Sequence, residues 1–126
     1  MITYRVLLVD DDSFFLEKIL HPIINTLINQ SICTKDFLIE SKLAYNGKEG
    51  WDTYQEYKPD IVVTDYNMPI MGGEELAAKI ASATHQPKAL FLISSDPDAR
   101  IKNMTKYINK KDVMNLFVQA NKTARN

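Results

Sequence analysis

The fold is decided by residues 61–73, which read Ile-Val-Val-Thr-Asp-Tyr-Asn-Met-Pro-Ile-Met-Gly-Gly. The first four residues are all β-branched, a pattern typical of a strand that is buried on both faces of a parallel sheet. An acid, Asp65, ends the run, and a loop with Pro69 and two glycines then leads into a helical pattern. This order of strand, acid, loop and helix predicts one repeating unit of an α/β fold.

Similar apolar runs and helical patterns alternate along the rest of the chain. Further strands are predicted at Val6–Val9, Ala89–Ile93 and, more weakly, at Phe37–Ala44 and Tyr107–Asn109. Helices are predicted at residues 13–29, with a cap at Asp12 or Ser13 and a kink or shortening at Pro22, and at 48–57, 74–83 and 112–123. Residues 97–106 leave room for only a short or irregular fourth helix. The alternation predicts a doubly wound α/β fold, with a five-stranded parallel sheet flanked by helices.

Composition narrows the class of protein. The 126 residues fit one domain, and 45% hydrophobic with 25% charged residues is typical of a globular chain rather than a disordered one. No apolar run approaches the roughly 20 residues of a membrane helix, so we expect no membrane insertion. The single cysteine indicates a reducing, cytoplasmic environment. The net charge of −1 hides a split, because residues 1–99 hold 8 basic and 15 acidic residues while residues 100–126 hold 7 and 1.

Acidic side chains follow two of the predicted strands. Asp10 and Asp11 come directly after the first strand, and Asp65 ends the third. Carboxyl ends of parallel strands meet at one edge of a sheet, where ligands of such folds bind. Converging carboxylates repel one another unless a cation neutralises them, so the pattern predicts a hard divalent metal such as Mg²⁺. A lone acid in this position is more often a helix cap, which is the interpretation we prefer for Asp12.

Two more polar residues follow the remaining strands. Ser94 ends the fourth and Lys110 follows the fifth. A hydroxyl and an ammonium that face an acidic pocket together are suited to holding a phosphoryl group. Taken singly, a serine after a strand often starts a turn and a surface lysine is often solvated, so their joint placement carries the inference.

These positions together resemble the receiver domain of two-component response regulators. The resemblance runs from about residue 5 to residue 120, and its most specific part is residues 61–73, similar to the family's strand followed by Asp-x-Asn-Met-Pro-x-Met-x-Gly. It implies a flavodoxin-like receiver fold and a single receiver domain over residues 1–126. It also implies that Asp65 takes a phosphoryl group from a histidine kinase or a histidine phosphotransfer protein.

The resemblance implies a role for each remaining site residue. Asp10, Asp11, Asp65 and the backbone carbonyl of Asn67 would hold Mg²⁺, with Mn²⁺ as a substitute. Lys110 and Ser94 would contact the phosphoryl group, and Ser94 with Tyr107 would form the switch. Asn67 and Asp96 would tune the lifetime of the phosphorylated state, which we expect to be short.

The resemblance also implies a signalling protein rather than an enzyme, one that acts by protein contact without binding nucleic acid directly. The positive charge of residues 100–126 lies where the family presents its output face, from the fourth strand to the fifth helix. We therefore expect an acidic or phosphorylated target, bound less tightly as salt rises.

Three departures from the family pattern bear on the output mechanism and leave the phosphorylation residues in place. Lys111 stands where the family has proline, Gly72 stands where aspartate is common, and the connection from Ser94 to Lys110 is short. Alternatives therefore stay open: a degenerate receiver that binds partners without phosphorylation, and the receiver portion of a larger regulator. A small phosphatase of the haloacid dehalogenase type is disfavoured, because Phe14 occupies the position where that family prefers Thr or Val.

Overall fold

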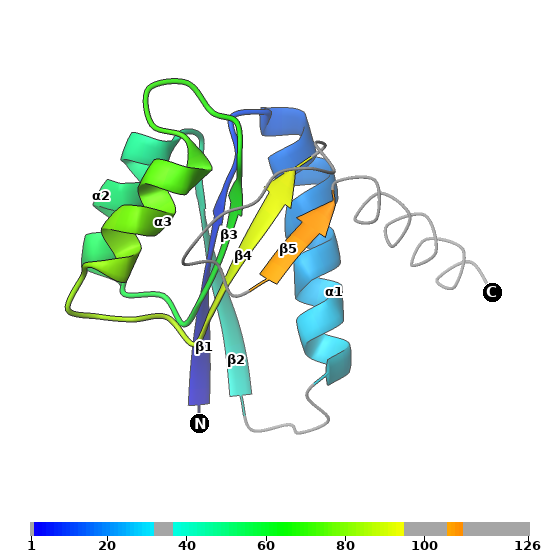
Figure 1. Ribbon diagram of the computed structural model, residues 1–126. Coiled ribbons are helices and arrows are strands. Elements are labelled where there is room, and N and C mark those ends of the chain that lie inside the picture. Colours follow the sequence, from blue (N-terminus) through cyan, green and yellow to red (C-terminus); the bar gives the residue numbers. More distant parts are fainter. Residues whose placement is uncertain (1, 32–36, 95–105, 110–126) are drawn as a thin grey trace.

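Five parallel strands form one sheet within residues 2–31, 37–94 and 106–109, which the computed structural model describes (Figure 1). The strands are β1 (Ile2–Val9), β2 (Phe37–Ala44), β3 (Ile61–Asp65), β4 (Ala89–Ser94) and β5 (Lys106–Asn109). They lie in the order β2-β1-β3-β4-β5, so the chain steps outward from β1 to β2 and then returns to β3 on the other side. The predicted parallel sheet is confirmed, and its switch point lies between β1 and β3.

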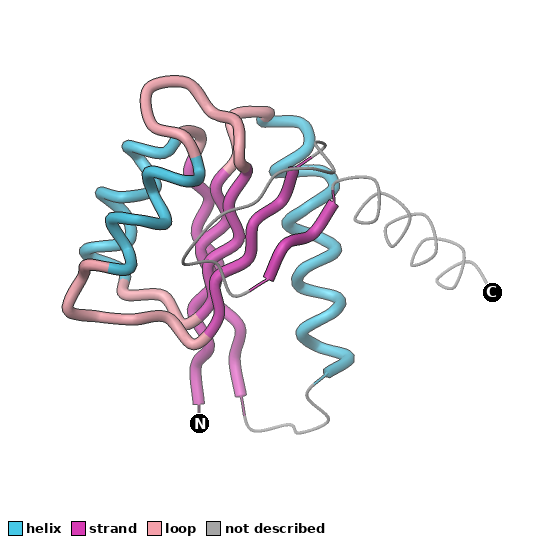
Figure 2. Tube along the Cα trace, viewed as in Figure 1, coloured by secondary structure: helices cyan, strands magenta, loops and turns pink. Residues whose placement is uncertain are grey.

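Helices cover both faces of the sheet (Figures 1 and 2). The π-helical segment η1 (Phe15–Leu20) and α1 (His21–Ser31) cover one face, and α2 (Gly47–Tyr57) and α3 (Gly73–Ala81) cover the other. This confirms the doubly wound α/β architecture. None of the helices in the described part of the chain has the length and hydrophobicity to span a bilayer.

The core explains why the strands are apolar at every residue. In β1, Val6 and Leu8 pack under η1 and α1, whereas Leu7 and Val9 pack under α2 and α3. All four side chains are fully buried. Successive side chains of a strand point to opposite faces, so a strand covered on both sides needs an unbroken apolar run.

The first helix accommodates Pro22 by widening rather than by ending. Helical structure starts at Ser13 and runs to Ser31, with Pro22 as the second residue of α1. Directly before it, the His21 N–H donates to the Leu16 carbonyl, five residues back. Proline has no N–H to continue the regular α-helical pattern, and a π-helical turn upstream is a recognised way to absorb such a disturbance.

Two predicted features of the output face lie outside the described residues. The first is the short fourth helix predicted at 97–106, where the only described residue, Lys106, begins β5. The second is the final helix predicted at 112–123. The peptide bond at Lys111 lies outside as well.

Candidate functional site

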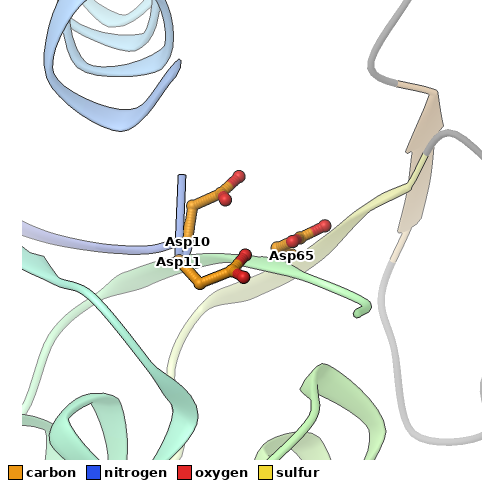
Figure 3. A group of neighbouring side chains, drawn as sticks. All are labelled: Asp10, Asp11 and Asp65. Atoms are coloured by element: carbon orange, nitrogen blue, oxygen red, sulfur yellow. The ribbon is translucent and has the colours of Figure 1, made fainter. Parts of the chain in front are cut away.

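Three carboxylates meet at the carboxyl edge of the sheet, as the strand order predicts (Figure 3). One oxygen each from Asp10, Asp11 and Asp65 lies within 4.8 Å of the others. β1 and β3 are hydrogen-bonded neighbours in which Val9 pairs with Thr64, so the residues that follow lie side by side. Asp10 is fully buried and Asp65 nearly so, whereas Asp11 is exposed to solvent.

Local hydrogen bonds fix the first acids. The Asp10 N–H donates to the Ala44 carbonyl at 3.1 Å, which joins the end of β1 to the end of β2. The Asp10 Oδ1 atom accepts the Asp12 N–H at 2.9 Å. The Asp12 Oδ1 atom in turn accepts the Phe15 N–H at 3.1 Å. Asp12 therefore caps the first helix, as predicted. The cluster that could bind a metal consists of Asp10, Asp11 and Asp65.

The loop after Asp65 is held by close backbone contacts that the sequence analysis missed. The Gly73 N–H donates to the Tyr66 carbonyl at 2.9 Å. A Cβ at Gly73 would overlap the Asp65 carbonyl oxygen, and a Cβ at Gly47 would overlap the Met71 carbonyl oxygen. The sequence analysis assigned no packing role to either glycine, so their part in bringing α2 and α3 against this loop was not predicted.

The same loop contains a strained residue. Ile70 has φ of 72°, is 80% exposed, and sits at the centre of a γ-turn in which the Met71 N–H donates to the Pro69 carbonyl at 2.7 Å. A β-branched residue at positive φ is an outlier that the surrounding structure must stabilise. Gly72, by contrast, has φ of −76° and ψ of 171°, a conformation open to any residue.

The other predicted site residues are placed to different extents. Ser94 ends β4, is buried, and lies one residue beyond the pair formed by Asp65 and Ile93, so it belongs to the same edge of the sheet. Asn67 is exposed in the loop after Asp65. The backbone of Tyr107 pairs with Leu92 in the sheet, but its side chain lies outside what is described, as do Asp96 and Lys110.

The donor set fits a hard divalent cation. Mg²⁺ binds through one or a few carboxylate oxygens and keeps several waters, which leaves positions for phosphoryl oxygens. The buried carboxylates of Asp10 and Asp65 and the exposed carboxylate of Asp11 provide three such oxygen ligands. The same three charges would repel one another without a cation, which gives the site a physical reason to bind one.

Comparisons with known proteins point to one family. Residues 6–115 match the family model described as the response regulator receiver domain. The chain is 33% identical over 93 residues to a protein-glutamate methylesterase/protein-glutamine glutaminase of Colwellia psychrerythraea, covering 73% of the chain and 21% of that protein. A similar protein of Hahella chejuensis is 31% identical over 99 residues, covering 79% of the chain and 23% of the relative. The chain thus spans about a fifth of the length of these curated relatives.

Solved structures show the same fold. A putative response regulator from Chloroflexus aurantiacus superposes with a TM-score of 0.70 at 19% identity, covering 94% of both chains. The response regulator domain of Thermotoga maritima CheB gives 0.65 at 20% identity, covering 98% of this chain and 94% of that one.

Proposed function

Because the chain belongs to the response regulator receiver domain family, we propose that Asp65 is its phosphoacceptor and that the phosphoryl group comes from a histidine kinase or a histidine phosphotransfer protein. The observation that carries this proposal is the meeting of three carboxylates at the ends of β1 and β3. Asp65 is the member of the cluster that begins the family's most specific loop, and it is buried at the end of β3.

The reaction requires one nucleophile and little else from the protein. A carboxylate oxygen of Asp65 attacks the phosphorus of the donor's phosphohistidine, the bond from phosphorus to the imidazole nitrogen breaks, and that nitrogen keeps the electron pair. The product on this chain is an acyl phosphate. Asp10, Asp11, Asp65 and the Asn67 backbone carbonyl would hold Mg²⁺, which when bound offsets the negative charge shared by the acids and the phosphoryl group.

The remaining roles concern the state after transfer. Ser94 would donate a hydrogen bond to a phosphoryl oxygen, and Lys110 would pair with another. Tyr107 would change position together with Ser94, whereas Asn67 and Asp96 would set how readily water reaches the acyl phosphate. The phosphoryl group adds about two negative charges, enough to shift the balance between two arrangements of a surface.

We further propose that the chain is a cytoplasmic switch rather than an enzyme acting on a separate substrate. Its signal would pass to a protein target through the face from β4 onward, where the +6 charge of residues 100–126 favours an acidic or phosphorylated surface. A partner affinity that does not change between low and high salt would contradict this part of the proposal.

Intact mass spectrometry tests the phosphoacceptor directly. The chain is incubated with acetyl phosphate and Mg²⁺, and we expect a mass increase of about 80 Da, one phosphoryl group. Asp65→Asn should abolish the adduct, and Asp12→Asn should retain it, because Asp12 caps a helix outside the cluster. A folded wild-type chain that forms no adduct with any donor would favour a degenerate receiver, and an adduct that survives Asp65→Asn would place the acceptor elsewhere.

A further inference from the structure

A hollow of about 720 Å³ lies between α2 and α3 and extends to the turn that follows α3, so most of its lining is in or beyond the C-terminal halves of the two helices. Its lining includes Trp51, Tyr54, Lys58, Glu75, Lys79 and His85. Helices in this fold run opposite to the strands, so their C-terminal halves lie toward the amino edge of the sheet, away from the three acids (Figure 1). The volume is within the range of specific binding sites, and no lining residue belongs to the proposed phosphorylation site.

The floor of this groove is aromatic and rigid. The rings of Trp51 and Tyr54 stack with their centroids 5.9 Å apart and their planes at 11°. The Tyr54 hydroxyl donates to the His85 carbonyl at 2.6 Å, and the His85 Nε2 atom donates to the Pro59 carbonyl at 2.8 Å. Tyr54 is buried and Trp51 is half-buried, so an indole surface held in place by fixed neighbours stays open to a partner. Such preorganised aromatic side chains dominate many protein interfaces.

The rim of the groove is positively charged. Lys79 Nζ lies 5.7 Å from the centre of the Trp51 ring, and the exposed Lys58 stands at the end of α2, with Glu75 as the one acid in the lining. Residues 1–99 hold 8 basic and 15 acidic residues, so a groove with two lysines and one acid stands out from this part of the chain. Charge of this sign suits an acidic occupant.

The backbone conformation of Lys58 is a second observation that supports a binding role for the groove. It follows α2 with φ of 51° and ψ of 63°, the left-handed conformation in which helices usually place glycine. A lysine near a helix C-terminus gains from the helix dipole, which explains a positive charge in this region. A lysine elsewhere in the last turn of α2 would have the same favourable interaction with the helix dipole without adopting the left-handed conformation. The strained conformation of Lys58 therefore supports a function for its side chain at this position.

We propose that this groove binds an acidic, amphipathic segment of a partner protein. An apolar side chain of the segment would pack on Trp51, and its carboxylates would pair with Lys58 and Lys79. The hollow is open to solvent between two helices, a shape that accepts one side of a helix or strand. The acidic residues that predominate in residues 1–99 would repel the carboxylates of a segment bound in a shifted position, which adds specificity.

Two synthetic peptides with the same apolar pattern test the proposal, one with glutamate and one with lysine at every polar position, and neither with tryptophan. Trp51 is the chain's single tryptophan, so its fluorescence reports on the groove, and amide chemical shifts map the contact. We expect saturable binding of the glutamate peptide only, with shifts at the groove. The double variant K58E/K79E should weaken binding by about tenfold or more. The control Lys18→Glu reverses one exposed charge on η1, away from the hollow, and should change the affinity less than about twofold.

Lys58→Gly separates binding from folding. Glycine suits the left-handed conformation, so this variant should be at least as stable as the wild type yet bind the glutamate peptide several-fold more weakly. The proposal is overturned if Lys58→Gly and K58E/K79E leave the affinity unchanged, or if the lysine peptide binds equally well. It is also overturned if the binding does not saturate up to about 1 mM peptide, or if the chemical-shift changes fall only outside the groove.

Discussion

Replacing Gly73 with alanine should release the loop after Asp65. The added Cβ would overlap the Asp65 carbonyl oxygen and lie 3.0 Å from both the Asp65 carbonyl carbon and the Tyr66 Cα. These are backbone atoms that cannot rotate away, so the start of α3 must shift by about 1 Å to restore van der Waals contact. The shift would break the hydrogen bond from the Gly73 N–H to the Tyr66 carbonyl, now 2.9 Å long.

The expected cost follows from three contributions. Overpacking costs about 1–3 kcal/mol, the lost hydrogen bond about 1 kcal/mol, and the better helix propensity of alanine returns about 0.5–1 kcal/mol. The free energy of unfolding should therefore fall by about 1–3.5 kcal/mol. The neighbouring Gly72 provides a matched control, because its Cβ would lie 3.3 Å from the Tyr66 carbonyl oxygen at a φ that any residue adopts. Gly72→Ala should cost less than about 1 kcal/mol.

Urea unfolding of both variants provides the measurement, with equal m-values as the check that the comparison is valid. Phosphorylation by acetyl phosphate should slow in Gly73→Ala, because the peptide unit that follows Asp65 moves, and should be nearly unchanged in Gly72→Ala. If the two variants lose equal stability, or if Gly73→Ala is neutral, the close backbone contact does not hold the loop and the reasoning fails.

Three further changes test other contacts. Asp12→Ala should lower the free energy of unfolding by about 1 kcal/mol through loss of the cap on the Phe15 N–H, measured by urea titration; an unchanged midpoint would refute the cap. Burial, with the Glu40 charge nearby, raises the pKa of Tyr57 to about 12, so its contribution to stability is complete below about pH 10 and is lost toward pH 12. Tyr57→Phe should lose less stability over that range, and parallel curves for the two proteins would contradict this. Asp11→Asn should raise Tm without Mg²⁺, because one repulsive charge is gone, and should remove the Mg²⁺-dependent rise in Tm; a full Mg²⁺ response in the variant would argue against a metal ligand.

Sequence patterns predicted the layers of this fold well because burial on both faces leaves a direct trace in the strands. Val6–Val9 is apolar at every position and becomes the core of β1, with all four side chains buried. The convergence of Asp10 and Asp65 was predictable for a related reason. Parallel neighbouring strands end at one edge, so two acids at strand ends must approach each other once the strand order is known.

Features that depend on close tertiary contact were not predictable in the same way. Gly73 resembled any glycine before a helix, and only the packing of α3 against the end of β3 shows that a side chain cannot fit. The positive φ of Ile70 opposes its intrinsic preference, so the surrounding loop and not the local sequence determines it. The roles of Lys110 and Tyr107 stay predictions.

The π-helical segment was not predicted from the sequence. Phe15, Ile19 and Ile23 repeat at intervals of four, whereas an α-helix completes a turn in 3.6 residues, so each interval would drift by about 40° around a regular helix. All three are nevertheless buried in the same cluster. A drift of this size stays within the apolar stripe of an ordinary amphipathic α-helix, so the repeat predicted a helix but not its π-helical turn.

The π-helical turn of η1 also changes how this helix can be compared with a regular α-helix. In η1 the hydrogen bond from His21 to Leu16 spans five residues instead of four, so Ile23 and Ile24, which follow it, face the directions they would have if one residue had been inserted in a regular α-helix. Positions before Phe15 match those of a regular α-helix by simple counting from Asp11. Beyond Leu20 the match to such a helix is displaced by one position, so equivalence along this part of the helix has to be established in space.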